Sequence, residues 1–146
     1  MTGPVFVDTN VLVYARDAAA GSKQRAAADW MRHLWTERAG RLSYQVLQEF
    51  YVTVTQKLSP GLEPADAREE VRALCAWDPV KLDARALEGA WHLQDRYALS
   101  WWDALIVAAA ELAGCPYLLT EDLQSGQELG SLTVVDPFAT SPAGLE

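Results

Sequence analysis

The chain has 146 residues, half of them hydrophobic, and its 12 Lys and Arg against 20 Asp and Glu give a formal net charge of −8. This composition is typical of one globular domain. It excludes a disordered chain and a protein that binds nucleic acid through a broadly basic surface, although not a nucleic-acid enzyme. No apolar run approaches the roughly 20 residues of a membrane span, and the start, MTGPVFVDTN, lacks the features of a signal peptide.

The apolar pattern predicts short strands that alternate with longer helices. The first strand is expected at residues 4–8, PVFVD, where two β-branched valines precede Asp8-Thr9-Asn10, a run typical of a helix N-terminus. The further elements, in chain order, are a helix at 22–38 capped by Ser22, a strand at 41–43, helices at 45–57 and 64–76, a strand at 80–82, helices at 84–96 and 101–113, and strands at 117–120 and 132–135. Short strands that are mostly apolar on both faces imply a parallel sheet covered on both sides. The expected fold class is therefore α/β, a three-layer α/β/α sandwich with a short central parallel sheet.

Domain organisation follows from the sequence, which contains no internal repeat, low-complexity tract or linker. Residues 1–140 are expected to form a single domain, and residues 141–146 are expected to form a C-terminal tail. The final Leu145-Glu146 is interpreted as the remainder of an expression tag, so it receives no functional role.

Cysteine and histidine residues give no indication of a soft-metal site. Cys75 and Cys115 fit neither a disulfide framework nor a zinc spacing, which favours a protein of the reducing cytoplasm. His33 and His92 lie in helical patterns without a partner at ligand spacing, and they are interpreted as surface or packing residues.

Two acidic residues follow predicted strands. Asp8 ends the first strand, and Asp122 comes two residues after the strand that closes with Thr120. Because ligands bind beyond the carboxyl ends of the strands in open parallel sheets, both acids lie where a site is expected. Each also has a simpler interpretation, Asp8 as a helix N-cap and Asp122 as part of a polar turn.

Two more acids lie in predicted helices. Glu49 lies off the apolar stripe of residues 45–57, as a solvent-exposed residue would. Asp103 stands between a Trp-Trp pair and an apolar turn, which is an unusual place for a carboxylate. The simpler interpretation is that Ser100 and Asp103 form a helix-capping arrangement.

Together, these four acids predict a cation site. Two carboxylates about 5 Å apart repel each other by roughly 3 kcal/mol at an effective dielectric constant near ~20, so a cluster of four persists only if protons or cations neutralise it. Oxygen ligands without His or Cys suit Mg²⁺ or Mn²⁺ rather than zinc. Such ions can activate a water molecule for attack on a phosphodiester.

The segments around the four acids resemble a known family. They are similar in order, spacing and total chain length to the four acidic motifs of PIN-domain nucleases, and above all to the VapC-type toxins of bacterial toxin–antitoxin pairs. The segments are VFVDTNVLVYA, QEFYVT, SWWDALIVAAA and YLLTEDLQ. This resemblance implies an endoribonuclease that depends on Mg²⁺ or Mn²⁺ and hydrolyses phosphodiester bonds in RNA. It makes Asp8 and Asp103 the candidates for direct metal ligands, while Glu49 and Asp122 complete the acidic pocket directly or through water.

The resemblance also implies further roles and partners. Thr9 and Asn10 match the family's polar neighbours of the first acid, and Thr120 matches its hydroxyl two residues before the fourth, so these three side chains are expected at the substrate. Glu121 is an alternative to Asp122, although the T-x-D pattern favours Asp122. Family members typically form homodimers, and a cognate antitoxin inhibits them by covering the pocket with its C-terminal segment.

Basic residues near the first motif are candidates for contacts with RNA phosphates. They are Arg16, Lys23 and Arg25, although each of them could be an ordinary solvated helix charge. The RNA must be single-stranded or looped if a base is to be recognised by stacking.

Other functions remain open at this point. The first alternative is a catalytically inactive PIN-like binding module. A DNA-directed nuclease fits less well, because the chain is too short for the clamp and helical arch of flap-cutting relatives. A phosphoaspartyl receiver or haloacid-type phosphatase also fits less well, since Asn10 stands where such a phosphatase needs a second Asp.

Overall fold

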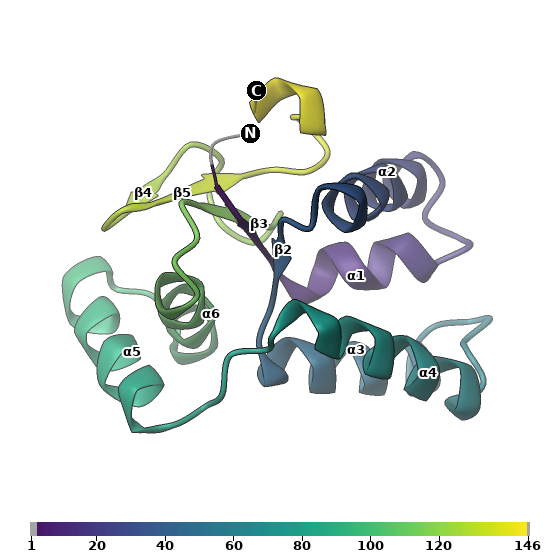
Figure 1. Cartoon of the computed structure of the whole chain (residues 1–146), viewed down its shortest axis with the longest axis horizontal. Helices are drawn as coiled ribbons and strands as arrows, with labels where there is room; N and C mark the ends of the chain where they lie inside the picture. The colour runs from purple at the N-terminus through teal and green to yellow at the C-terminus, as the bar shows by residue number, and fades with distance from the viewer. Residues whose placement is uncertain (1–2, 146) are drawn as a thin grey trace.

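The computed structural model describes residues 3–145, and Figure 1 shows a central sheet with helices on both sides. Within this range five strands form one sheet in the order β2-β1-β3-β5-β4. Their bounds are Val5–Val7 for β1, Gly40–Arg41 for β2, Tyr117–Leu119 for β3, Glu128–Leu129 for β4 and Leu132–Val135 for β5. β1 pairs in parallel with β2 and β3, β3 pairs in parallel with β5, and β4 is antiparallel to β5. Residues 1–2 and 146, which belong to the expected domain and tail, lie outside the described residues.

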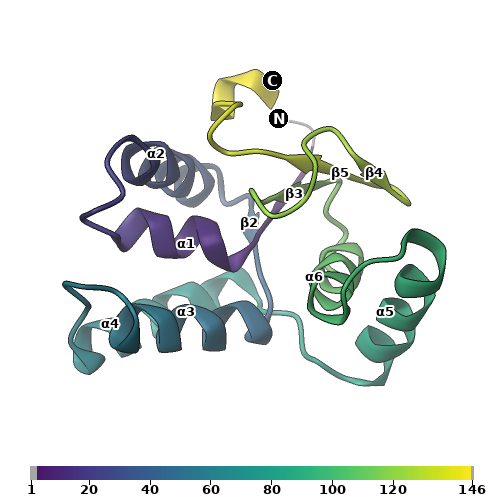
Figure 2. The same cartoon turned by 180° about the vertical axis from the view of Figure 1, so that it is seen from behind.

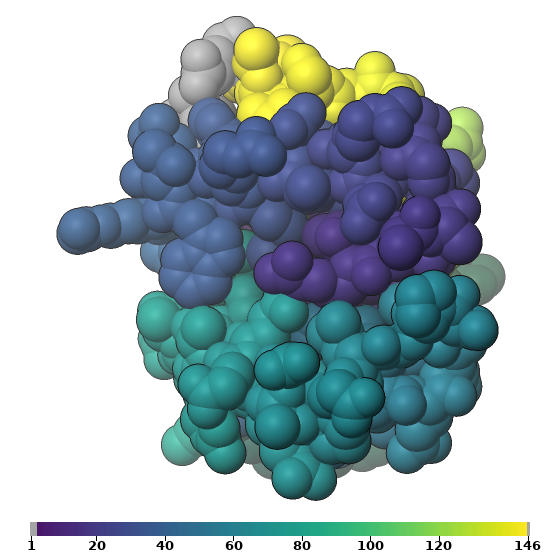
Figure 3. Space-filling view, turned by 90° about the vertical axis from the view of Figure 1, so that its right-hand side faces the viewer, coloured from purple at the N-terminus to yellow at the C-terminus, as the bar shows by residue number. Residues whose placement is uncertain are grey.

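The helices form two groups. Their bounds are Thr9–Arg16 for α1, Ser22–Glu37 for α2, Tyr44–Gln56 for α3, Pro64–Leu74 for α4, Ala84–Tyr97 for α5 and Trp101–Leu112 for α6. α1 packs on α2 and α3, α3 packs on α4, and α5 packs on α6. Figures 1 and 2 show α1 to α4 on one side of the strands and α5 and α6 on the other, and Figure 3 shows α1 and α2 stacked above α4. This arrangement confirms the predicted α/β/α fold.

Burial follows from the two helical layers. All three residues of β1 are completely buried, as expected for a strand that is apolar on both faces. α6 is buried from Ala104 to Ala110, which explains why its sequence is apolar on every side rather than along one stripe. Cys75 is exposed and Cys115 is buried; both are free, and burial raises the pKa of the Cys115 thiol to about 12. No helix in the described part of the chain is long and apolar enough to cross a membrane.

The C-terminal segment is held against α2. The indole N–H of the buried Trp30 donates to the carbonyl oxygens of Pro137 and Thr140, at 3.1 and 2.9 Å. A 3₁₀ turn, η2, follows at Pro142–Leu145, and Leu145 packs against the core. The domain boundary expected at residue 140 stays a prediction, although residues 142–145 contact the domain.

Three predicted elements differ from the structure. The strand expected at 41–43 is formed by Gly40–Arg41, and Ser43 makes a separate bridge to Val80. No strand forms at 80–82: Val80 makes one parallel bridge to Ser43, and the next two residues are exposed and leave the sheet. The helix expected at 64–76 ends at Leu74, and a 3₁₀ turn, η1, continues it at Cys75–Trp77.

Two local details also differ. Ser22 does not cap α2 but is its first residue, because Gly21 occupies the cap position with a left-handed φ of 59° that glycine adopts without strain. The strand β4, Glu128–Leu129, was not predicted, because two residues are too short to show an alternating pattern.

Candidate active site

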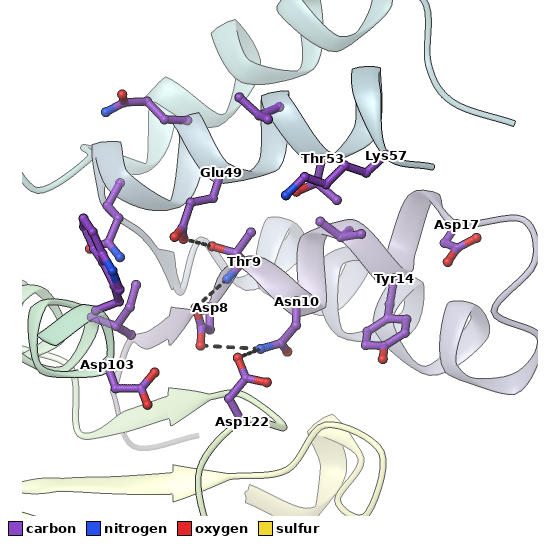
Figure 4. Close-up of a pocket in the computed structure, with 16 residues that line it drawn as sticks. Asp8, Thr9, Asn10, Tyr14, Asp17, Glu49, Thr53, Lys57, Asp103 and Asp122 are labelled. Atoms are coloured by element: carbon purple, nitrogen blue, oxygen red, sulfur yellow. Dashed lines mark hydrogen bonds between the residues drawn. The ribbon is translucent and has the colours of Figure 1, made fainter. Parts of the chain in front are cut away.

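An open pocket of about 770 Å³ lies at the carboxyl ends of β1 and β3 (Figure 4). All four acids predicted from the sequence line this pocket. Asp8 directly follows β1, Glu49 comes from α3, Asp103 from the first turn of α6, and Asp122 from the loop after β3. The topology explains this convergence, since neighbouring parallel strands end at the same edge of the sheet.

Asp8 is buried at the centre of a hydrogen-bond network. One carboxylate oxygen accepts from the backbone N–H of Thr9 at 2.7 Å, so Asp8 also caps α1 as expected. The other oxygen accepts from the Thr120 hydroxyl at 2.9 Å and from the Asn10 amide at 3.4 Å. Burial raises the pKa of Asp8 to about 7, and the nearby charges of Asp122 and Glu49 add to this rise, whereas hydrogen bonds from Thr120 and Thr9 oppose it.

Thr120 and Asn10 connect Asp8 to Asp122. Thr120 is completely buried, and its hydroxyl oxygen also accepts from the backbone N–H of Asp122 at 3.0 Å. The Asn10 amide lies 3.0 Å from the Thr120 hydroxyl and 3.1 Å from the Asp122 carboxylate, to which it donates. The structure therefore gives Thr120, which was expected at the substrate, a position behind the carboxylates, where it orients them.

Glu49 and Asp103 face the pocket from two different helices. Glu49 is exposed, as its place off the apolar stripe predicts, and its carboxylate accepts from the Thr9 hydroxyl at 2.7 Å. The backbone N–H of Asp103 donates to the Ser100 hydroxyl at 3.2 Å, so the capping interpretation also holds. In Figure 4 the carboxylate of Asp103 turns toward the space beside Asp8. The cap uses the backbone N–H of Asp103, so its side chain can face the pocket at the same time.

Glu121 lies beside Asp122 in sequence but is not among the residues that line the pocket. Its carboxylate accepts from the Tyr14 hydroxyl at 2.5 Å and from the Lys23 ammonium group at 2.9 Å. Burial acts to raise the pKa of Glu121, but the contacts with Lys23 and Tyr14 outweigh it and lower this pKa. The geometry therefore favours Asp122 over Glu121 as the fourth acid of the pocket.

The three basic residues expected at RNA phosphates lie outside the pocket lining. Arg16 forms an ion pair with Glu70 of α4 at 2.7 Å, and Lys23 pairs with Glu121. Arg25 is exposed on the first turns of α2. Two of these three cations already have a carboxylate partner, which leaves less of their charge for a phosphate.

Polar side chains of α3 besides Glu49, and that of Lys57 directly after the helix, also line the pocket, and none of them was predicted as a site residue. Gln45, Glu49, Thr53 and Lys57 follow one another at intervals of four, and all four line the pocket. A spacing of four places side chains on one face of a helix, so the residues could have been grouped with Glu49 in advance. We call this set the α3 row; Lys57 gives the pocket a cation that the motifs do not contain.

The donor set of the pocket fits Mg²⁺ or Mn²⁺. It consists of carboxylate oxygens, and hard cations prefer such ligands. In the part of the chain that the structure describes, no three His, Cys, Asp or Glu side chains stand together as a complete ligand set. Mg²⁺ usually keeps several waters and takes one or two carboxylates from the protein. The surroundings of Asp8 agree, because its hydrogen-bond partners are neutral and the charges nearest to it are negative.

Comparisons with known proteins give the family and the fold. A family model, the PIN domain, matches residues 5–125. A toxin–antitoxin complex from Klebsiella pneumoniae has a TM-score of 0.64 and 20% identity, covering 91% of this chain and 97% of the other. VapBC2 from Rickettsia felis, bound to a DNA fragment of its promoter, has a TM-score of 0.58 and 15% identity, covering 89% and 96%. VapC20 from Mycobacterium tuberculosis, described as a Sarcin-Ricin loop cleaving toxin, has a TM-score of 0.55 and 20% identity, covering 78% and 86%.

No curated protein sequence matches the chain. At identities of 15 to 20% the solved structures establish the fold alone. The family model establishes the family as well, because it spans most of the chain and includes all four acids of the pocket. The chain belongs to the PIN domain family.

Proposed function

We propose that the chain is an endoribonuclease that depends on Mg²⁺ or Mn²⁺ and acts as the toxin of a type II toxin–antitoxin pair. The observation that carries this proposal is the convergence of Asp8, Glu49, Asp103 and Asp122 on one pocket. Four carboxylates from four segments repel one another, and the arrangement is useful when cations neutralise them.

Each acid has a place in the proposed mechanism. Asp8 and Asp103 would hold the metal, and Glu49 and Asp122 would complete the acidic pocket directly or through water. The bound metal supplies a water of lowered pKa and positive charge for the phosphate. The chain itself orients the acids, since Thr9 donates to Glu49.

Substrate binding needs a cation that can reach RNA. Lys57 is exposed and lines the pocket, so it is the best-placed side chain for a phosphate. Arg25 is also exposed, whereas Arg16 and Lys23 would have to exchange their carboxylate partners for phosphate. One structural neighbour is described as a Sarcin-Ricin loop cleaving toxin, which supports RNA as the substrate class.

The proposed partners are a cognate antitoxin and a second copy of the chain, in the cytoplasm. One structural neighbour is described as a toxin–antitoxin complex, and another is named VapBC2. The acidic pocket of a chain with a net charge of −8 favours a cationic inhibitor segment. Exposed apolar side chains on α5, Leu87 and Trp91, are available for a homodimer contact.

RNA cleavage assays test the proposed function. We expect cleavage in Mg²⁺ or Mn²⁺, none in EDTA, and none with Asp8→Asn or Asp103→Asn when circular dichroism shows an intact fold. Metal-dependent cleavage by both variants would show that the site is assigned wrongly. Affinity for RNA without turnover at any metal concentration would favour the inactive binding module, and cleavage of DNA alone would favour the DNA-directed nuclease.

A further inference from the structure

An exposed tryptophan stands beside the acidic pocket. Trp102 is 62% exposed, more than any other large hydrophobic side chain in the described range. It lies in the first turn of α6, directly before Asp103, and it lines the pocket. An indole with most of its surface in water contributes little to the stability of the fold, whereas its planar face is suited to stacking.

A buried amide lies in the wall of the same pocket. Gln45 is only 5% exposed, and neither its amide oxygen nor its amide nitrogen has a hydrogen-bond partner among the described residues. It belongs to the α3 row, one helical turn before Glu49. A buried polar side chain without a partner destabilises a protein, so such a group in a pocket indicates a ligand that can pair with it.

We propose that Trp102 and Gln45 form a subsite for one unstacked base of single-stranded RNA, beside the acids of the pocket. This inference rests on the proposed function, and it names the part of the RNA that the pocket holds. Aromatic side chains stack on unpaired bases, and a glutamine amide offers one donor and one acceptor to a base edge. The carboxylates repel phosphate, so neutral contacts of this kind are needed where the pocket is most acidic.

The α3 row gives the bound RNA a direction. Gln45 and Lys57 are twelve residues apart, which corresponds to about 18 Å along a helix. Lys57 attracts phosphate, whereas Trp102 and Gln45 carry no charge. The base therefore lies toward the start of α3, and the neighbouring backbone phosphates lie toward its end, with Glu49 between them.

Binding measurements with two probes test the subsite. The probes are a short fluorescent RNA without secondary structure and an abasic copy of the same length, both in Ca²⁺, with the RNA checked for integrity after each titration. We expect Trp102→Ala to weaken binding of the RNA by about 5- to 100-fold and to leave binding of the abasic copy unchanged. Trp102→Phe should stay within a few-fold of the wild type. The matched control is Trp35→Ala, because Trp35 is 41% exposed on α2 outside this pocket, and it should change neither affinity.

Gln45→Met provides the second arm, because it keeps the length of the side chain and removes the amide. We expect it to leave the melting temperature unchanged or raised, since no hydrogen bond is lost, and to weaken RNA binding by about 2- to 10-fold. A clear fall in melting temperature would overturn the role of Gln45, because it would mark the amide as part of the fold.

The outcomes separate this inference from the proposed function. If Trp102→Ala affects the RNA and its abasic copy equally, or affects neither, the subsite does not exist, even if the wild type cleaves RNA. If the wild type binds RNA better than the abasic copy through Trp102 but never cleaves it, the subsite stands and the proposed function fails.

Discussion

Asp8 and Glu121 are carboxylates that follow neighbouring parallel strands, and the groups around them differ in charge. Glu121 is paired with the Lys23 ammonium group, which also lies 5.1 Å from the ring centroids of Tyr14 and of Phe138. Asp8 is buried among neutral donors, with Asp122 and Glu49 as its charged neighbours. The pKa of Glu121 is accordingly lowered, against the effect of its burial, whereas burial raises that of Asp8 to about 7.

Under the proposed function, this difference distinguishes a carboxylate that holds the fold together from one that takes part in catalysis. Where a carboxylate joins two parts of the fold, as Glu121 joins α1 and α2 to the loop after β3, the chain provides the compensating cation. Among the described residues the chain provides no such cation beside Asp8, and under the proposed function a metal ion from solution takes that place. Perturbed carboxylates of this kind are concentrated at functional sites.

The largest expected effect concerns adjacent residues. Asp122→Asn should slow RNA cleavage by about 100-fold or more, because it removes a few kcal/mol of transition-state stabilisation. Every ~1.4 kcal/mol of this stabilisation corresponds to a tenfold change in rate. Glu121→Gln should stay within a few-fold, since Glu121 lies outside the pocket lining. Initial rates at saturating Mg²⁺ measure both. Equal losses in the two variants would remove the distinction between these carboxylates.

A smaller loss is expected when the support behind Asp8 is removed. Thr120→Val keeps the shape of the side chain but deletes the hydroxyl that donates to Asp8. We expect cleavage to fall by about 10- to 100-fold and the Mg²⁺ concentration for half-maximal activity to rise, as for other groups that orient metal ligands. Thr133→Val on β5 is the control, and it should change neither quantity. A lower rate with unchanged Mg²⁺ dependence would argue against positioning.

Metal binding should also appear as a change in stability. At ten times its dissociation constant Mg²⁺ stabilises the native state by about 1.4 kcal/mol, which raises the melting temperature by about 3–6 °C for a chain of this size. Asp8→Asn should abolish this rise, and Glu70→Gln, at the Arg16 ion pair, should leave it intact. Calorimetry with and without Mg²⁺ provides the measurement. An unchanged response in Asp8→Asn would place the cation elsewhere.

The smallest effect belongs to the paired carboxylate. The pKa of Glu121 in the folded chain is below its ordinary value of 4.5, so its contribution is present above that value and is lost as the pH falls through the folded pKa. Glu121→Gln should therefore lower the free energy of unfolding by about 0.5–1 kcal/mol near neutral pH, and by progressively less in acid. Urea titrations at several pH values test this. The control Glu69→Gln, at an exposed ion pair on α4, should show almost no difference at any pH.

The sequence predicted the fold class and the meeting of the four acids in one pocket, because both depend on local patterns. Buried strands, capped helices and acids at their ends are visible without knowledge of the packing. Three of the simpler interpretations also hold, since Asp8 caps α1, Glu49 is exposed, and Ser100 caps α6 through the backbone N–H of Asp103. A residue can serve as a cap through one oxygen and still face the pocket, so local patterns cannot decide between the two roles.

Other features depend on contacts between distant parts of the chain. The pairing of Lys23 with Glu121 spans 98 residues, so Lys23 resembled an ordinary candidate for phosphate. The spacing of the α3 row was visible, but which face of α3 meets the pocket depends on its packing against α1. The prediction of a strand at 80–82 was wrong for the same reason. Whether a segment at the edge of a sheet pairs depends on the neighbouring strands rather than on its own residues.

The two hydrogen bonds from Trp30 to the C-terminal segment, here called the Trp30 clamp, affect which substitutions the chain can tolerate. Its indole N–H is shared between two backbone carbonyl oxygens, and every residue type carries such an oxygen. The clamp therefore makes no demand on the side chains at positions 137 and 140, while at position 30 it requires a long, rigid donor inside an apolar core. Replacing Trp30 would leave a large void and two carbonyl groups short of a donor. One residue of α2 thus constrains the backbone path of a distant segment without selecting the side chains at positions 137 and 140.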